Sequence, residues 1–403
     1  MFPRKVLLTA LLCPPLLTAV ATNAQAENPA QFNACVAQLK STARDQGISE
    51  IVVERDLANV NYVERVIELD RRQPEFTEGF ATYFERRVTE DRIVRGRKLL
   101  DEHRTLLNRV SKEFGVPPQY LVAFWGLETN FGGFFGKMPV LDSLATLACD
   151  ERRSAYFTGE LVNALKIIDE GSISAERMQG SWAGAMGHTQ FMPSVFLRYA
   201  IDYDGDGKRD LWGSLPDALA SAANFLRGIG WRNEERWGRE VKLPSNFSFD
   251  NTGLGTKLSL RQWHDLGVRQ ANGSALPRID MQASLLVPSG YQGPAFLVYE
   301  NFHVIMRWNR AEAYALAVGH LADRINGAGK LSRDPVQSPR LSREQVIQLQ
   351  QALNELGFQA GEADGVLGPG TRAAISRYQK STGKIADGFP GKALLAQFGV
   401  ITE

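Results

Sequence analysis

The sequence predicts a mainly α (α+β) protein, on three observations. Apolar residues recur at helical spacing through most of the first 230 residues. Between Val241 and Val298 this pattern gives way to short runs rich in Asn, Ser, Gly, Pro and Val, which favour a small β-rich insert. The stretch 327–340 has the composition of a linker, and a compact helical module follows it over 341–403. A chain of 403 residues with 44% hydrophobic residues can hold two or three such domains.

The first 26 residues have the composition of a secretory signal peptide. Arg4 and Lys5 form a positive flank, 6–20 is apolar, and 24–26 is a small-x-small cleavage site. The apolar run is interrupted by two prolines and is too short for a membrane span. Removing this segment leaves 44 basic and 45 acidic residues, which does not favour nucleic-acid binding. We therefore expect an exported protein with no transmembrane segment in its mature chain.

The cysteines fit export to an oxidising compartment. Cys13 lies in the segment expected to be removed, which leaves Cys35 and Cys149. Two cysteines allow one bridge, and we expect a Cys35–Cys149 disulfide. Two buried free thiols are the alternative, because sequence alone does not show proximity.

Helices are expected in order along the chain, and 48–76 is of mixed character. The expected helical stretches are 28–47, 80–114, 114–129, 141–148, 156–169, 217–230 and 301–322. The last of these carries Trp308, Asn309 and Tyr314, whose side chains suit the lining of a sugar groove. Aromatic residues at helical spacing are equally common in a protein core.

The stretch 114–136 places an acid in an unusual setting. Two consecutive prolines suit a helix start. Phe124, Trp125 and then Glu128 follow at helical spacing, so Glu128 lies in register with the apolar face. Lost hydration would raise its pKa, as general-acid cleavage of a glycosidic bond requires. The glycines that follow end the helix and leave room for a ligand. A helix-end Glu capped by its own turn is the alternative.

The stretch 179–194, QGSWAGAMGHTQFMPS, is rich in small residues. Small residues allow a ligand or another helix to approach the backbone closely. It also carries Ser181, His188 and Gln190. Ser181 and Gln190 are either ligand contacts or caps within a tightly packed region.

The stretch 202–210, DYDGDGKRD, predicts a metal-binding loop of EF-hand type. The expected ligands are five carboxylates and one backbone carbonyl, from Asp202, Asp204, Asp206, Lys208, Asp210 and Asp217. Position 12 of the loop is Gly213 instead of Glu, and Asp217 is expected to supply the missing carboxylate. Hard oxygen ligands suit Ca²⁺, or Na⁺, in a structural role. An acidic Asp-Gly turn without an ion is the alternative.

The module over 341–403 is expected to contain three helices. Ser342 and Gln345 form a capping-box pattern before an apolar helical repeat, which Gly357 ends. Two Asp-Gly turns, at 364–365 and 387–388, each precede a further helix.

Several of these segments together resemble the membrane-bound lytic transglycosylase B family of peptidoglycan-cleaving enzymes. They are FGVPPQYLVAFWGLETNFG, LDSLATLA, SWAGAMGHTQFMPS, DYDGDGKRDLW and NFHVIMRWN, in family order. The C-terminal LQQALNELGF and DGVLGPGTRAAISRYQ resemble the peptidoglycan-binding type 1 module. The resemblance implies a lysozyme-like catalytic domain over 27–326 and a periplasmic location. The partners it implies are peptidoglycan glycan strands and other cell-wall enzymes.

The resemblance also implies nonhydrolytic cleavage of the β-1,4 bond between N-acetylmuramic acid and N-acetylglucosamine. Glu128 would act as acid and then as base, without a catalytic cofactor, giving a 1,6-anhydro sugar. The substrate-binding residues it implies are Ser181, Gln190, Tyr83, Tyr156, Trp308, Asn309 and Tyr314. Trp308 departs from the family, where tyrosine is common at this position. A hydrolytic muramidase and a noncatalytic wall-binding scaffold are the alternatives.

Overall fold

The computed structural model describes residues 29–72 and 78–402, and these are mostly helical with one larger sheet. The predicted signal peptide lies outside the described residues. Within the described part of the chain, no helix is both long and apolar enough to cross a membrane.

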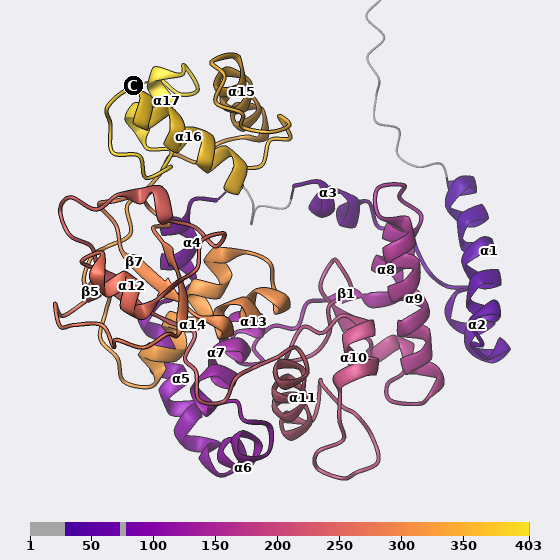
Figure 1. Ribbon diagram of the computed structural model, residues 1–403. Coiled ribbons are helices and arrows are strands. Elements are labelled where there is room, and N and C mark those ends of the chain that lie inside the picture. Colours follow the sequence, from indigo (N-terminus) through magenta and orange to yellow (C-terminus); the bar gives the residue numbers. More distant parts are fainter. Residues whose placement is uncertain (1–28, 73–77, 403) are drawn as a thin grey trace, which may run out of the picture.

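The helices follow the predicted order (Figure 1). Their bounds are α1 Pro29–Asp45, α2 Glu50–Asp56, α3 Glu64–Arg72, α4 Phe80–Arg87, α5 Glu90–Glu102, α6 Arg104–Phe114, α7 Pro118–Thr129, α8 Val140–Ala148, α9 Ser154–Asp169, α10 Pro193–Tyr199, α11 Leu215–Gly228, α12 Leu260–Asp265, α13 Glu300–Trp308, α14 Glu312–Ile325, α15 Arg343–Glu355, α16 Pro369–Ser381 and α17 Lys392–Gln397.

Two stretches predicted as single helices are divided. The stretch 80–114 forms α4, α5 and α6. The Thr89 side chain caps the start of α5 by accepting a hydrogen bond from the Arg92 N–H, and α6 begins after His103. The stretch 301–322 is divided between α13 and α14, where Asn309 has extended backbone and its Oδ1 accepts the Ala311 N–H at 3.1 Å. This second break places the end of one helix beside the start of the next.

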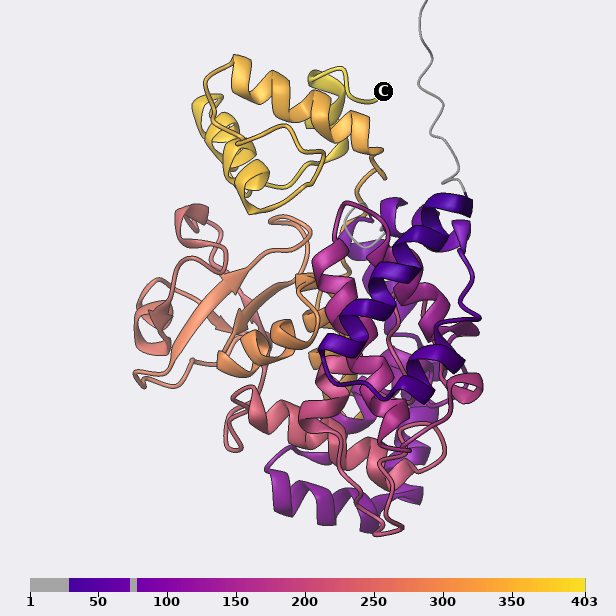
Figure 2. The same cartoon turned by 90° about the vertical axis from the view of Figure 1, so that its right-hand side faces the viewer.

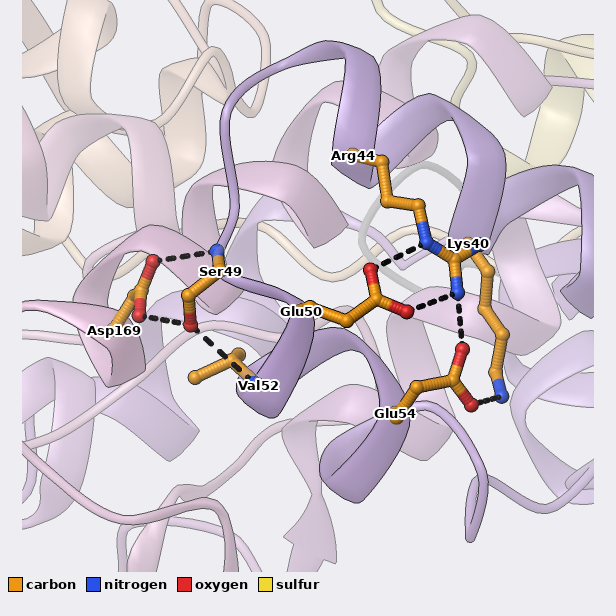
Figure 3. Close-up of polar contacts among 7 residues, drawn as sticks. All are labelled: Lys40, Arg44, Ser49, Glu50, Val52, Glu54 and Asp169. Carbon is orange, nitrogen blue, oxygen red and sulfur yellow. Dashed lines mark hydrogen bonds and ion pairs between the residues drawn. The ribbon is translucent and has the colours of Figure 1, made fainter.

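The N-terminal helices dock on α8 and α9. Arg44 and Lys40 of α1 form ion pairs with Glu50 and Glu54 of α2, as Figure 3 shows. Ser49, at the start of α2, donates from its N–H and its hydroxyl to the Asp169 carboxylate, at 2.9 and 2.6 Å. The predicted disulfide is present and joins Cys35 of α1 to Cys149 at the end of α8. A covalent bond and polar contacts thus tie these helices to the body.

The predicted β-rich insert is a five-stranded antiparallel sheet with its own hydrophobic core. Its strand order is β4-β6-β7-β3-β5, with bounds β3 Gly238–Lys242, β4 Leu258–Ser259, β5 Arg269–Gln270, β6 Gln282–Leu286 and β7 Ala295–Val298. A separate two-stranded ladder pairs β1 Met138–Pro139 with β2 Gln179–Gly180. This ladder joins the loop after α7 to the small-residue stretch.

The stretch predicted as a linker contains no helix or strand, yet it is fixed to the body. Leu331 packs on the main hydrophobic core. The Ser332 N–H and hydroxyl donate to Glu240, and Gln337 bonds Thr82 and Glu85 of α4. The three helices α15–α17 then enclose a core of their own, beside the insert (Figure 2).

Candidate active site

Glu128 lies in the last turn of α7, a helix at the centre of the molecule (Figure 1). Residues 120–127 and Thr129 are all buried, so α7 is surrounded by protein on every side. Glu128 therefore lies among apolar residues as expected, but α7 has no exposed opposite face, and the implied division into an apolar and a wet face was wrong. Glu128 is sheltered because the whole helix is internal, and its side chain keeps partial contact with solvent.

Two side chains donate hydrogen bonds to one oxygen of the Glu128 carboxyl. The Trp308 indole Nε1–H, from the end of α13, donates to Oε1 at 2.9 Å. The Tyr314 hydroxyl, from the first turn of α14, donates to the same oxygen. Within the described residues no hydrogen bond reaches Oε2. Because Oε1 is occupied as an acceptor, a proton on the acid belongs on Oε2, where it is available for transfer.

Burial raises the pKa of Glu128 to about 7, although the bonds from Tyr314 and Trp308 and the charge of Arg87 act in the opposite direction. At neutral pH the group is therefore divided between its acid and carboxylate forms. A carboxyl poised in this way can both donate and accept a proton near the working pH.

An aromatic wall fixes Trp308 beside the acid. Its ring centroid lies 4.4 Å from Phe124, 5.1 Å from Phe225 and 5.5 Å from Phe191. The indole ring is thereby held with its N–H directed at Glu128. The sequence predicted Trp308 as a substrate contact and did not indicate its hydrogen bond to the acid, because the two residues are 180 positions apart in the chain.

The backbone after Glu128 is held by a second cluster. The Trp125 Nε1–H donates to His188 Nδ1 at 2.9 Å, and the Thr129 hydroxyl donates to the His188 carbonyl at 3.1 Å. Burial lowers the pKa of His188 to about 4, so its ring is neutral and Nδ1 can accept. Gly132 has a φ of +75°, and a Cβ there would lie 2.4 Å from the His188 ring, so only glycine fits.

Two predicted substrate residues brace the loops beside the site. Gln190, with a φ of +50°, donates from Nε2 to the carbonyls of Phe135 and Gly187, both at 3.0 Å. The Ser181 Oγ accepts the Ala183 and Ala185 N–H groups. Both residues thus have a structural role in the loops, and each keeps a polar atom for a ligand: Oε1 of Gln190 and the hydroxyl hydrogen of Ser181.

The other predicted substrate residues differ in exposure. Tyr83 is buried in α4, with the Arg87 guanidinium 5.4 Å from its ring centroid. Tyr156, in the first turn of α9, is half exposed, and Asn309 is exposed. In the described part of the chain none of these three bonds Glu128 directly. Arg87, whose charge acts on the Glu128 pKa, was missed, since nothing in the sequence distinguishes it from its neighbouring arginines.

The acidic loop brings together three of its five carboxylates. Asp202, Asp204 and Asp217 each offer an oxygen within 4.8 Å of the others. Asp206 and Asp210 are outside this group. Backbone N–H bonding does not separate the two sets, because Asp202, Asp217, Asp206 and Asp210 all accept N–H groups of the loop at 2.7 to 2.9 Å. The three converging hard oxygen donors fit a calcium-type ion.

Replacing Trp308 by Phe should shift the pH dependence of glycan cleavage upward. The indole bond favours the carboxylate, so its loss raises the Glu128 pKa further. Cleavage that needs the protonated acid falls as pH rises through that pKa, so the alkaline limb of kcat/KM should move to higher pH. Trp212→Phe is the matched control, because that indole bonds the Gln179 carbonyl instead. An unmoved limb in Trp308→Phe would contradict the role of the bond.

A mostly helical body with one sheltered glutamic acid at the end of a central helix defines the lysozyme-like class of glycan-cleaving proteins. The chain belongs to the family described as Transglycosylase SLT domain, which residues 31–323 match and whose members are peptidoglycan-cleaving lyases. Residues 342–398 match a peptidoglycan binding domain.

Three relatives illustrate the similarity. Membrane-bound lytic murein transglycosylase B of Escherichia coli (strain K12) is 36% identical over 251 residues, which are 60% of this chain and 66% of that protein, just under two thirds of its length. SltB3 from Pseudomonas aeruginosa, in complex with NAG-anhNAM-pentapeptide, is 42% identical with a TM-score of 0.87, covering 91% of this chain and 99% of that chain. Escherichia coli Slt35 in complex with calcium is 30% identical with a TM-score of 0.63, covering 75% and 94%.

Proposed function

We propose that this chain cleaves the β-1,4 bond between N-acetylmuramic acid and N-acetylglucosamine in peptidoglycan without using water. The observation that carries the proposal is the solitary character of Glu128. Its carboxyl bonds two neutral groups, the Trp308 indole and the Tyr314 hydroxyl, and the charge that acts on its pKa is the cation Arg87. Glycosidases that hydrolyse usually need two carboxylates about 5 to 9.5 Å apart.

In the proposed reaction Glu128 gives its Oε2 proton to the glycosidic oxygen as the bond to C1 breaks. The acetamido group of the muramic acid residue stabilises the positive charge at C1. The Glu128 carboxylate then takes the proton of the C6 hydroxyl as that oxygen bonds C1. The acid is restored, no water is consumed, and the product is a 1,6-anhydro sugar. The anhydro-muramic ligand of the SltB3 complex is the kind of product expected.

The residues beside the acid have proposed roles in this reaction. Trp308 and Tyr314 orient the carboxyl and stabilise its ionised form. Ser181, Gln190, Tyr83, Tyr156 and Asn309 are proposed substrate contacts. The domain division is proposed as a catalytic domain over 27–326, the segment 327–340 and a peptidoglycan-binding module over 341–403. A periplasmic location is supported by the disulfide, which is typical of exported proteins.

The mass of the products separates this function from its alternatives. Isolated sacculi digested by the full chain should release muropeptides ending in the anhydro sugar, one water lighter than reducing-end products. Products one water heavier would indicate a hydrolytic muramidase. Failure to release any soluble product would indicate a binding scaffold.

We also propose that the loop over 202–217 binds calcium, and a structural relative, Slt35, is known in complex with calcium. Calcium should raise the Tm of the chain, since an ion at 100 times its Kd stabilises the folded state by about 2.7 kcal/mol. Asp202→Asn should abolish the shift, because Asp202 belongs to the converging group. Asp206→Asn is the control and should keep the shift. Equal responses in both variants would contradict the three-carboxylate site.

A further inference from the structure

A cavity of about 850 Å³ lies between the insert and the C-terminal module, apart from Glu128. One wall is the insert loop 243–250 with Tyr291 and Gln292, and the other is Lys380 with 384–386 of the module. Arg333 from the connecting segment completes the lining. A volume of this size is typical of a ligand site.

Direct contacts hold the insert and the module together on either side of the cavity. Lys380 of the module pairs with Asp250 of the insert at 2.9 Å. The Tyr291 N–H donates to Asp387 at 2.9 Å. A Cβ added to Gly290 would meet the Asp387 carboxylate at 2.8 Å, so the insert and the module are closely packed beside the cavity. The cavity is therefore a built feature of this joint.

The lining has an excess of positive charge. It contains Arg333, Lys380 and Lys384 against a single acid, Asp250, which Lys380 neutralises. Lys384 bonds the neutral Gln397 amide, and Arg333 bonds the Tyr291 carbonyl. Within the described residues neither of these two cations has a carboxylate within 4.0 Å. The cavity thus presents two cations without counter-charges, although the chain as a whole is nearly neutral.

Apolar rings lie beside these cations. Phe247 and Phe249 belong to the insert wall and stack edge to face, with centroids 5.4 Å apart. Tyr291 is 42% exposed at the rim. Cations beside aromatic surface suit a short peptide that carries free carboxylates and small apolar side chains.

We propose that this cavity binds the stem peptide of peptidoglycan, with Lys384 and Arg333 contacting its carboxylates and Phe247 and Phe249 contacting its alanine methyl groups. The proposal rests on the proposed function, since that function supplies peptide-bearing glycan as the substrate. The cavity would hold a peptide of the strand while a distant sugar linkage lies at Glu128. It would therefore contribute affinity for the cell wall and leave the chemical step unchanged.

The test measures binding of a free, fluorescently labelled stem pentapeptide to the full-length Glu128→Gln protein. Lys384→Glu should weaken binding about tenfold or more, as expected for loss of a charge-assisted contact. Lys392→Glu is the matched control, because Lys392 is an exposed lysine of the same module outside the cavity, and its variant should bind normally. The peptide with amidated carboxylates should bind weakly to every variant.

Phe249→Ala supplies a second variant that leaves all charges in place, and it should also weaken peptide binding. Equal binding by Lys384→Glu and Lys392→Glu would overturn the proposal, and so would equal binding of the amidated peptide. Cleavage of sacculi by otherwise wild-type protein is measured in parallel. If the cavity variants bind normally while Glu128→Gln is inactive, the cavity proposal fails alone. If Glu128→Gln remains active, the proposed function itself fails.

Discussion

Glu128→Gln should reduce the release of soluble muropeptides from sacculi by at least about 10³-fold. General acid–base catalysis contributes roughly 10²- to 10⁴-fold, and here one group serves in both proton transfers. An amide can neither donate the proton that the leaving oxygen needs nor take one from the C6 hydroxyl. Its carbonyl oxygen can still accept the bonds from Trp308 and Tyr314, so the fold should persist.

Glu113→Gln is the matched control for this prediction. Glu113 is an exposed glutamate whose carboxylate accepts the Tyr203 hydroxyl at 3.1 Å, and among the described residues it is not one of the groups that bond Glu128 or act on its pKa. Its variant should retain wild-type activity and the same thermal stability. Activity of Glu128→Gln near that of Glu113→Gln would remove Glu128 from the reaction.

Loss of the Cys35–Cys149 disulfide should lower the free energy of unfolding by about 2 to 5 kcal/mol. The bond spans 114 positions of sequence, and a long closed loop restricts the unfolded chain strongly. It also ties α1 to the end of α8, which lies within the same hydrophobic core. Urea denaturation of the Cys35→Ser, Cys149→Ser double variant measures this loss.

A reductant supplies the internal control for the disulfide. It should destabilise the wild-type protein toward the level of the double variant and leave the double variant unchanged. If the double variant unfolds at the wild-type urea concentration, the bond does not stabilise the fold.

The sequence was sufficient for the order of the longer helices, the insert and the module, and for Glu128 as a sheltered acid, but it did not indicate α10 or α12. Helical periodicity and helix-start signals identified α7, and short runs rich in Asn, Ser, Gly, Pro and Val identified the insert. The reason offered for the raised pKa was incomplete, however. A single apolar stripe was expected, whereas neighbouring helices cover α7 on every side. Local sequence does not reveal how many neighbours a helix will have.

The side chains that surround Glu128 could not be predicted from local sequence, because they come from distant parts of the chain. Trp308 was placed at the groove, but the indole bond to Oε1 follows from the break between α13 and α14, which periodicity did not indicate. Arg87, whose positive charge lowers the pKa of Glu128, belongs to a different helix, α4. Similarly, the motif predicted five aspartates as ligands, and only the folded loop shows that Asp202, Asp204 and Asp217 are the three that converge. Composition also predicted a linker at 327–340. It gave no indication that this segment would be attached to the catalytic body by hydrogen bonds.

Direct titration of the Glu128 carboxyl tests the central claim, that a sheltered glutamic acid is poised near neutrality. Protein labelled with ¹³C at glutamate side-chain carboxyls can be followed by NMR as pH is varied, and the Glu128 signal is the one absent from Glu128→Gln. The account predicts a midpoint at about pH 7, where burial places this pKa. A midpoint near 4.5, the value of an ordinary exposed glutamate, would contradict it.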